Sequence, residues 1–246
     1  MSASLPFGFC LCLTAALASC GPAVISSGGS CYGRDIYGHR PGPKGFETVI
    51  IDAGHGGKDN GATSPHSGQR EKDLALDTAM RIRNELSRDF KVILMRSDDN
   101  FIDLDERVLR ANRSPNAILI SMHYNSGPSS CRGPETYYWR VDSHGLASRL
   151  QQAMCQASPA ETGNRGLVRR RMRLTRNPEI PCVLLEGGYL SNAAESRKIS
   201  GAAYRQKLAS GIAAAIRTQA AIGDAGTGPL PRPINAPPSR PTDAPE

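Results

Sequence analysis

The chain has 246 residues, 39% of them hydrophobic and 22% charged, which is typical of one soluble globular domain with tails. Its net charge is +7, so polyanions and acidic surfaces are conceivable partners. Aromatic residues make up only 5% of the chain, and no aromatic-basic run suggests a platform on which bases stack, so we expect no nucleic-acid partner.

The N-terminal segment has features of an export signal. Residues 7–17 form an apolar run too short to span a membrane, and the motif LASC ends at Cys20. This arrangement resembles a bacterial lipoprotein signal, in which cleavage leaves the cysteine as the lipidated first residue. Because residues 1–19 contain no Lys or Arg, an ordinary secretory signal cleaved nearby is the alternative. We expect a signal peptide over residues 1–19 and a periplasmic or cell-envelope lipoprotein, anchored to the membrane through Cys20.

Four further cysteines would remain after cleavage of the signal. They allow three disulfide pairings, among which the sequence does not choose, and no CxxC pair suggests a cysteine zinc site. Cys182, in the apolar run IPCVLLE, is a candidate for a buried free thiol. The four residues are Cys31, Cys131, Cys155 and Cys182.

Composition separates a folded part from two flanking segments. Residues 20–45 are rich in Gly, Ser and Pro, which is typical of a flexible linker. Residues 223–246 are dense in proline and are expected to be disordered. We therefore expect a single folded domain over residues 46–222.

Strand and helix patterns alternate along this domain. The helix over residues 71–89 has a clear pattern, since Leu74, Thr78, Ile82 and Leu86 recur at helical spacing. The alternation predicts an α/β fold with a mostly parallel twisted sheet flanked by helices on both faces. The expected elements are, in chain order, a strand over residues 47–53, a helix over 71–89, a strand over 91–97, a helix over 104–114, strands over 116–125 and 135–141, a helix over 144–157, strands over 169–177 and 181–188, and a helix over 203–221.

Three ionisable residues stand at the ends of predicted strands, where ligands bind in parallel sheets. His55 follows the first strand within AGHGG, His123 ends AILISMH, and Glu186 ends CVLLE. A fourth candidate, Glu71, opens the next helix. Each also has a possible structural role, such as a favourable interaction of Glu71 with the helix dipole or an ion pair for Glu186. Two histidines and a glutamate nevertheless suit a catalytic zinc with an open position, and another carboxylate could take a proton from water.

Four segments containing these residues resemble, in order and spacing, the motifs of the zinc-dependent N-acetylmuramoyl-L-alanine amidases. They are IIDAGHGGKDNGA, REKDLAL, SMHYNS and PCVLLEGGYLSN, and the resemblance extends over residues 48–221. Carried over residue by residue, it implies that His55, Glu71 and His123 bind Zn²⁺ and that Glu186 is the catalytic carboxylate. Residues 46–222 would then form a zinc amidase catalytic domain. The departures are small: Asn60 stands where proline is frequent, and Tyr189 replaces a frequent phenylalanine.

The resemblance implies hydrolysis of the amide between N-acetylmuramic acid and the L-alanine of the peptidoglycan stem peptide. Glu186 would accept a proton from water and deliver it to the departing amine. Some relatives carry an insertion that plugs the site; residues 126–181 are about as long as the fold needs, so we expect no plug. The alternatives are a zinc peptidase acting within the stem and a non-catalytic wall-binding lipoprotein. The oligomeric state is not predicted.

Two finer expectations concern supporting residues. Asp52 is a candidate for orienting a ligand histidine. Arg169, Arg171 and Arg173 would share one face of the strand predicted over residues 169–177 and could hold stem-peptide carboxylates, although a solvated charged face is an equal alternative.

Overall fold

The computed structural model of the chain describes Met1, residues 41–228 and residues 234–235. Residues 2–40 lie outside this description, and with them the predicted signal peptide apart from Met1, the lipidation site Cys20, Cys31 and most of the predicted linker. No helix among the described residues is long and apolar enough to cross a membrane.

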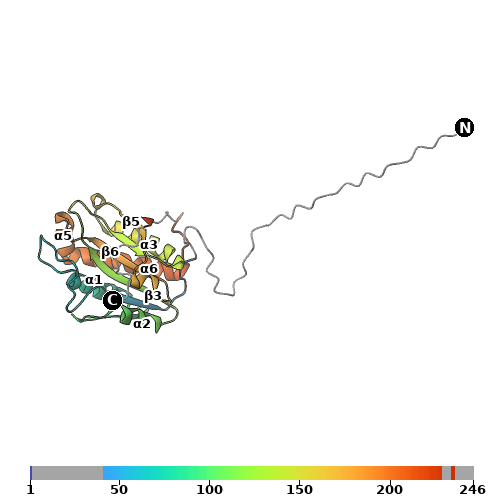
Figure 1. The fold of residues 1–246 in the computed structure, drawn as a ribbon, viewed down its shortest axis with the longest axis horizontal. Helices are drawn as coiled ribbons and strands as arrows, with labels where there is room; N and C mark the ends of the chain where they lie inside the picture. The colour runs from blue at the N-terminus through green and yellow to red at the C-terminus, as the bar shows by residue number, and fades with distance from the viewer. Residues whose placement is uncertain (2–40, 229–233, 236–246) are drawn as a thin grey trace. The chain divides into compact units, whose positions relative to one another are not determined.

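A single sheet forms the framework of the domain (Figure 1). Its strands lie in the order β2-β1-β3-β6-β4-β5-β7. All neighbouring strands are parallel except β4 and β6, so the predicted mostly parallel sheet is confirmed. The strands are β1 (Thr48–Ala53), β2 (Lys91–Leu94), β3 (Ala117–Asn125), β4 (Glu135–Tyr138), β5 (Gly166–Arg169), β6 (Cys182–Tyr189) and β7 (Ile234–Asn235).

Helices cover both faces of the sheet, as predicted. Because successive side chains of a strand point to opposite faces, Ile51 and Ile50 of β1 enter two different cores. The core around Ile51 also contains α1 (Glu71–Leu86), α3 (His144–Ala157) and α6 (Ala202–Ile222). The core around Ile50 contains side chains of α2 (Leu104–Asn112) and α4 (Arg173–Arg176). Two short 3₁₀ helices, Val141–Ser143 and Ala160–Thr162, and the helix α5 (Ala193–Ser200) complete the described elements.

The long helices agree with their sequence patterns. In α1, the four residues of the predicted stripe, from Leu74 to Leu86, are all buried. Thr78 within this stripe is hydrogen-bonded to the hydroxyl of Tyr124 on β3, with 2.7 Å between the oxygens, so the helix is tied to the sheet by a polar contact as well. The helix begins at Glu71, which places this carboxylate at the edge where β1 and β3 end.

The strand predicted over residues 169–177 is wrong. The strand β5 lies earlier, at Gly166–Arg169, and Arg173–Arg176 form one helical turn. Thr175 stabilises that turn, because its hydroxyl accepts from the backbone N–H of Met172 at 3.1 Å and donates to the carbonyl of Arg170 at 2.8 Å. The basic residues therefore do not share a strand face: Arg169 stacks over Trp139, and Arg173 pairs with Asp105 of α2.

Described residues beyond residues 46 and 222 form hydrogen bonds with one another and with the helices α3 and α6. Asp224 accepts hydrogen bonds from the backbone N–H of Gly42 and from Gln219 of α6, at 2.8 and 2.9 Å. Arg149 of α3 donates to the carbonyls of Gly223 and Ala225. Within the proline-rich segment that we expected to be disordered, β7 pairs with β5.

The helix α5 was not predicted. It begins after Asn192, whose side chain accepts hydrogen bonds from the backbone N–H groups of Ala194 and Glu195, both at 3.1 Å. Asparagine before a helix is a capping signal that the sequence contained.

Candidate metal centre

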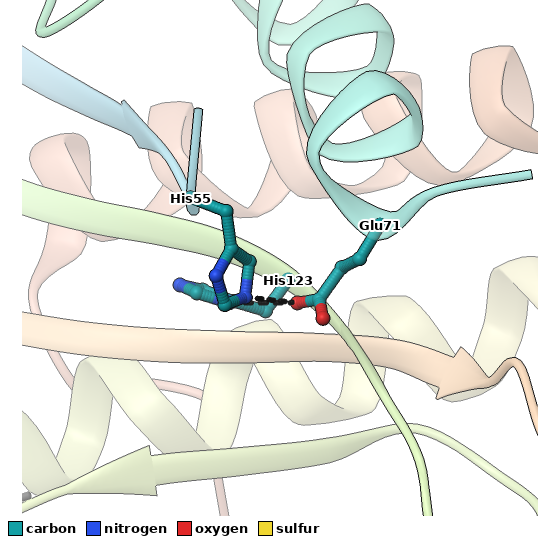
Figure 2. Close-up of side chains that lie close together, drawn as sticks. All are labelled: His55, Glu71 and His123. Carbon is teal, nitrogen blue, oxygen red and sulfur yellow. Dashed lines mark hydrogen bonds and ion pairs between the residues drawn. The ribbon is translucent and has the colours of Figure 1, made fainter. Parts of the chain in front are cut away.

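Three side chains from separate elements converge at the carboxyl edge of the sheet (Figure 2). His55 lies in the loop after β1, Glu71 is the first residue of α1, and His123 lies on β3. One ligand atom from each lies within 4.8 Å of the other two. Oε1 of Glu71 is 3.0 Å from Nε2 of His55 and 2.8 Å from Nδ1 of His123. The three predicted ligands are thus brought together.

This group fits a zinc ion. Two imidazole nitrogens and one carboxylate oxygen are a common donor set of catalytic zinc. At metal–ligand distances of about 2.0–2.1 Å, neighbouring ligands of a tetrahedral site lie ~3.3 Å apart, so the two distances from Glu71 to the histidines need to widen by only a few tenths of an ångström. In the described ranges no fourth His, Cys, Asp or Glu joins the group, which leaves a position for water or substrate.

Two glycines make room for the ligands. A Cβ atom on Gly54 would overlap the imidazole of His123, and one on Gly61 would lie 2.6 Å from Oε2 of Glu71. Gly61 also has φ of +60°, which glycine adopts without strain. His55 itself has φ of +61°, an uncommon conformation for a residue with a side chain. The glycine-rich sequence around His55 therefore supplies the space in which the ligands meet.

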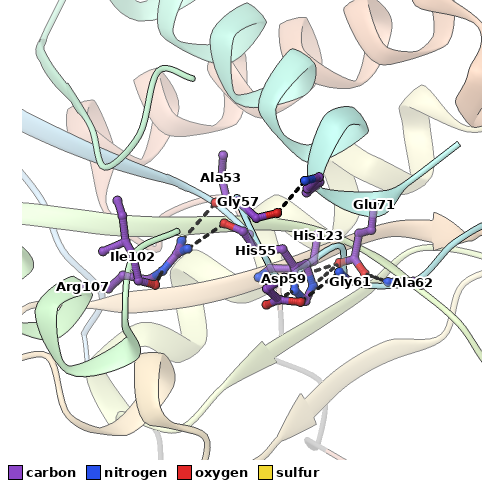
Figure 3. Close-up of polar contacts among 12 residues, drawn as sticks. Ala53, His55, Gly57, Asp59, Gly61, Ala62, Glu71, Ile102, Arg107 and His123 are labelled. Carbon is purple, nitrogen blue, oxygen red and sulfur yellow. Dashed lines mark hydrogen bonds and ion pairs between the residues drawn. The ribbon is translucent and has the colours of Figure 1, made fainter. Parts of the chain in front are cut away.

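Asp59, not Asp52, orients the histidine. His55 donates its Nδ1–H to Oδ2 of Asp59 at 2.7 Å, which leaves Nε2 facing Glu71 (Figure 3). Asp52 instead pairs with Arg107 and accepts a hydrogen bond from Ser121 at 2.7 Å. The expectation for Asp52 is therefore wrong, because its carboxylate bonds to Arg107 and Ser121 and not to a ligand histidine. Asp59 was missed, although its position four residues after His55 was a usable signal.

Electrostatics keep Glu71 ionised. Burial alone would raise the pKa of this carboxyl, but the contacts with His123 and His55 outweigh burial and lower the pKa well below its usual range. Oε2 of Glu71 also accepts a hydrogen bond from the backbone N–H of Ala62 at 2.9 Å. An ionised carboxylate is the form that binds a cation.

Glu186 lies beside this group but is not part of it. In the register of the sheet, Glu186 on β6 lies opposite His123 on β3 and opposite Glu135 on β4. Its Oε2 is buried and makes no hydrogen bond with the described part of the chain. Burial, reinforced by the negative charges of Glu71 and Glu135, raises the pKa of Glu186 well above its usual value. A carboxylate with high proton affinity next to a metal site is suited to general-base chemistry.

A polar cluster that the sequence did not reveal adjoins Glu186. Oε2 of the buried Glu135 accepts hydrogen bonds from the hydroxyls of Tyr189 and Tyr137, at 2.9 and 3.0 Å, and from the amide of Asn125 at 3.2 Å. The guanidinium of Arg165 stacks over the ring of Tyr189, 5.3 Å from its centroid. These residues join the ends of β3, β4 and β6 around Glu186.

The other histidines and cysteines that the structure describes are not in the metal group. His66 is exposed and donates to the carbonyl of Ser191 at 3.1 Å, and His144 stacks on Tyr138 at the start of α3. Cys131, Cys155 and Cys182 are not joined to one another. Cys182 is buried, as its apolar surroundings suggested, and its Sγ lies 3.2 Å from the carbonyl oxygen of Thr175.

The fold and the site together define an α/β protein with a two-histidine, one-glutamate metal centre and an adjacent buried glutamate. The family model for N-acetylmuramoyl-L-alanine amidases matches residues 49–218, and the chain belongs to this family. The resemblance noted in the four sequence motifs is thereby confirmed.

Individual relatives agree with this assignment. The chain is 35% identical over 171 residues to the uncharacterized protein YqiI of Bacillus subtilis, covering 68% of this chain and 81% of YqiI. It is 34% identical over 172 residues to the B. subtilis N-acetylmuramoyl-L-alanine amidase LytC, of whose length it spans 34%.

Solved structures give the same result. An N-acetylmuramoyl-L-alanine amidase of Clostridium difficile 630 superposes with a TM-score of 0.66 at 33% identity, covering 72% of this chain and 97% of that one. The catalytic domain of the amidase CwlV from Bacillus (Paenibacillus) polymyxa has a TM-score of 0.66 at 35% identity, covering 70% of this chain and 97% of that one.

Proposed function

We propose that the protein hydrolyses the amide between N-acetylmuramic acid and the L-alanine of the peptidoglycan stem peptide, with Zn²⁺ held by His55, Glu71 and His123. The proposal rests on the convergence of these three donors beside Glu186, whose buried Oε2 has no hydrogen-bond partner among the described residues. Family membership supports the substrate, because the matching family model describes amidases of this bond.

In this mechanism the chain's own residues hold the metal and move the proton. A bound zinc ion supplies Lewis-acid activation of the scissile carbonyl and of a water molecule. Asp59 holds the imidazole of His55 with Nε2 toward the site. Glu186 accepts a proton from the attacking water and delivers it to the nitrogen of the departing L-alanine. Glu135 and its tyrosine partners keep the strand ends around Glu186 in place.

Product analysis tests the reaction. Protein lacking residues 1–20 is loaded with zinc and incubated with purified peptidoglycan, and the soluble products are identified by mass spectrometry. We expect free stem peptides that begin with L-alanine, and we expect their release to stop on chelation and resume with zinc. Cuts inside the stem would instead support a peptidase, and zinc binding without release of any product would support a wall-binding role.

We further propose that the protein acts outside the cytoplasm, anchored through a lipid on Cys20. The motif LASC after the apolar run 7–17 supports this, as does a family whose substrate is the cell wall. Metabolic labelling with a fatty-acid analogue should label the exported full-length protein and not Cys20→Ala. Export of an unlabelled full-length protein would favour the ordinary secretory signal.

A further inference from the structure

Two buried arginines lie behind the metal centre and have no part in the mechanism above. The exposed fractions of Arg96, which follows β2, and Arg107, on α2, are 4% and 3%. Both guanidinium groups are directed at backbone carbonyls, and each offers five N–H donors in a fixed geometry. One such side chain can therefore connect several chain segments.

Arg107 connects the His55 loop to its surroundings. Its Nη2 donates to the carbonyl of His55 at 2.7 Å, its Nη1 to that of Ala53 at 3.0 Å, and its Nε to that of Ile102 at 3.0 Å (Figure 3). The buried guanidinium of Arg107 therefore holds the backbone of His55, a residue of the metal centre, directly.

Through Asp52, Arg107 also reaches the strand of a second ligand. Its guanidinium pairs with Asp52 of β1, which accepts a hydrogen bond from Ser121 at 2.7 Å. Ser121 precedes His123 by two residues on β3 and lies opposite Asp52 in the strand register. The position of His123 is therefore linked to the same guanidinium.

Arg96 connects the His55 loop to the third ligand. Its Nε donates to the carbonyl of Ala53 at 2.9 Å, and its Nη2 donates to the carbonyls of Gly54 at 2.7 Å and Lys72 at 2.8 Å. Lys72 follows Glu71 in the first turn of α1. The two arginines together contact or connect all three segments that carry the metal ligands.

The loop needs such contacts. A left-handed conformation such as that of His55 is unfavourable for a residue with a side chain and persists only where the surroundings impose it. The carbonyls of Ala53, Gly54 and His55 also need donors when they are turned toward buried groups, because an unpaired buried carbonyl destabilises the fold. The arginines meet both needs.

We propose that Arg96 and Arg107 are positioning residues that hold the three ligand segments in their metal-binding arrangement before the metal arrives. This inference rests on the proposed metal site and adds the device that assembles it. If the native protein binds no zinc, the proposed function itself fails. If the native protein binds zinc and the arginine variants bind it equally well, only the present inference fails.

The test compares Arg107→Lys and Arg96→Lys with a matched control. Arg205 on α6 is also a buried arginine with one carboxylate and two carbonyl partners: its Nε donates to Asp77 at 2.5 Å, and its Nη1 donates to the carbonyls of Ile199 and Ser200 at 2.7 and 2.8 Å. Arg205→Lys removes the same kinds of contact away from the metal centre.

Zinc affinity, measured by chelator competition, and the visible spectrum of the Co²⁺-substituted protein are the readouts. We expect zinc Kd to rise about 10- to 100-fold in the two site variants, with an altered Co²⁺ spectrum, because loss of groups that orient ligands has this effect. Arg205→Lys should lose thermal stability with Kd and spectrum unchanged. Unchanged Kd and spectrum in both site variants, or an equal rise of Kd in the control, would overturn the proposal.

A measurement on the native protein applies even where the variants fail to fold. Amide hydrogen exchange over residues 53–57 is compared with and without zinc. We expect the segment to be protected already in the zinc-free protein, because the arginines order the loop without the metal, and we expect zinc to add to that protection by stabilising the fold. Rapid exchange of this segment in the zinc-free protein would contradict the proposal.

Discussion

At the scale of single residues, the metal centre depends on the lack of a side chain at two glycines. Gly54 stands beside the ring of His123, and Gly61 stands beside His55 and Glu71. A methyl group at either position would occupy space that the ligand atoms need in order to come within reach of one ion. The glycines are as much a part of the site as the ligands are.

Gly54→Ala should weaken zinc binding while the domain still folds. Overpacking of this kind costs about 1–3 kcal/mol, which corresponds to a loss of affinity of roughly 5- to 150-fold when His123 is displaced. Competition with a chelator measures the affinity. Gly211→Ala is the control, because a Cβ there meets no atom closer than 3.4 Å and alanine favours the helix α6. Equal zinc affinity of both variants would show that the ring of His123 has room to move.

Glu186→Gln should abolish turnover and leave zinc binding intact. Loss of a general base lowers kcat by about 10²- to 10⁴-fold, whereas no metal ligand is removed. Release of stem peptides and zinc content are measured on the same preparation. Glu179→Gln, at an exposed glutamate, should retain full activity. A Glu186→Gln variant that turns over normally would remove this residue from the mechanism.

At the scale of elements, α1 carries Glu71 and packs against α6. Asp77 of α1 accepts hydrogen bonds from Arg205 of α6 and from Arg81, at 2.5 and 2.8 Å. Burial alone would raise the pKa of Asp77, but these two arginines outweigh it and lower the pKa. The ion pairs therefore fasten the helix at a point away from the site.

Asp77→Asn should destabilise the protein by about 1 kcal/mol at pH 7, since the carboxylate is partly exposed and screened by solvent. The depressed pKa means that this stabilisation is present above the unfolded pKa of Asp77 and is lost as the pH falls through the folded value. Urea unfolding at pH 7 and below pH 3 measures the difference between native protein and variant. A difference that persists unchanged in acid would contradict the ion-pair explanation.

At the scale of the whole molecule, the metal would join segments that are far apart in the chain. The three ligands come from a loop, a helix and a strand. His55 and Glu71 precede β2 and α2 in the chain, and His123 follows them. A ligand that binds only the folded chain stabilises it, and the free energy of stabilisation grows with the logarithm of the ratio of free ligand concentration to Kd.

Removal of zinc should lower the melting temperature of the protein. At a free zinc concentration of 100 times Kd, the stabilisation is about 2.7 kcal/mol. Thermal unfolding with zinc, with chelator and after readdition of zinc measures it. The variant His123→Ala should show no response to chelator, and an equal response in native protein and variant would place the effect at another site.

Most of the fold follows from local pattern. Leu74, Thr78, Ile82 and Leu86 recur at the helical period, and the buried runs of β1, β3 and β6 have strand composition, so these elements could be predicted. The structure of the segment 169–177 could not be predicted in this way. Its alternating basic residues match a strand pattern, but the hydroxyl of Thr175 bonds to nearby backbone groups and stabilises a helical turn. Side-chain to backbone contacts of this kind depend on local geometry that periodicity does not contain.

The sequence by itself determined the α/β class, the single domain, the three candidate zinc ligands and the candidate base, because residue type, period and motif order are local properties. Only the tertiary structure decided which groups support them. Asp59 rather than Asp52 orients His55, Glu135 lies beside Glu186, and two arginines reach the ligand segments. The physical reason is that these contacts are set by strand register and by the rotamers of long side chains, which join residues distant in the chain.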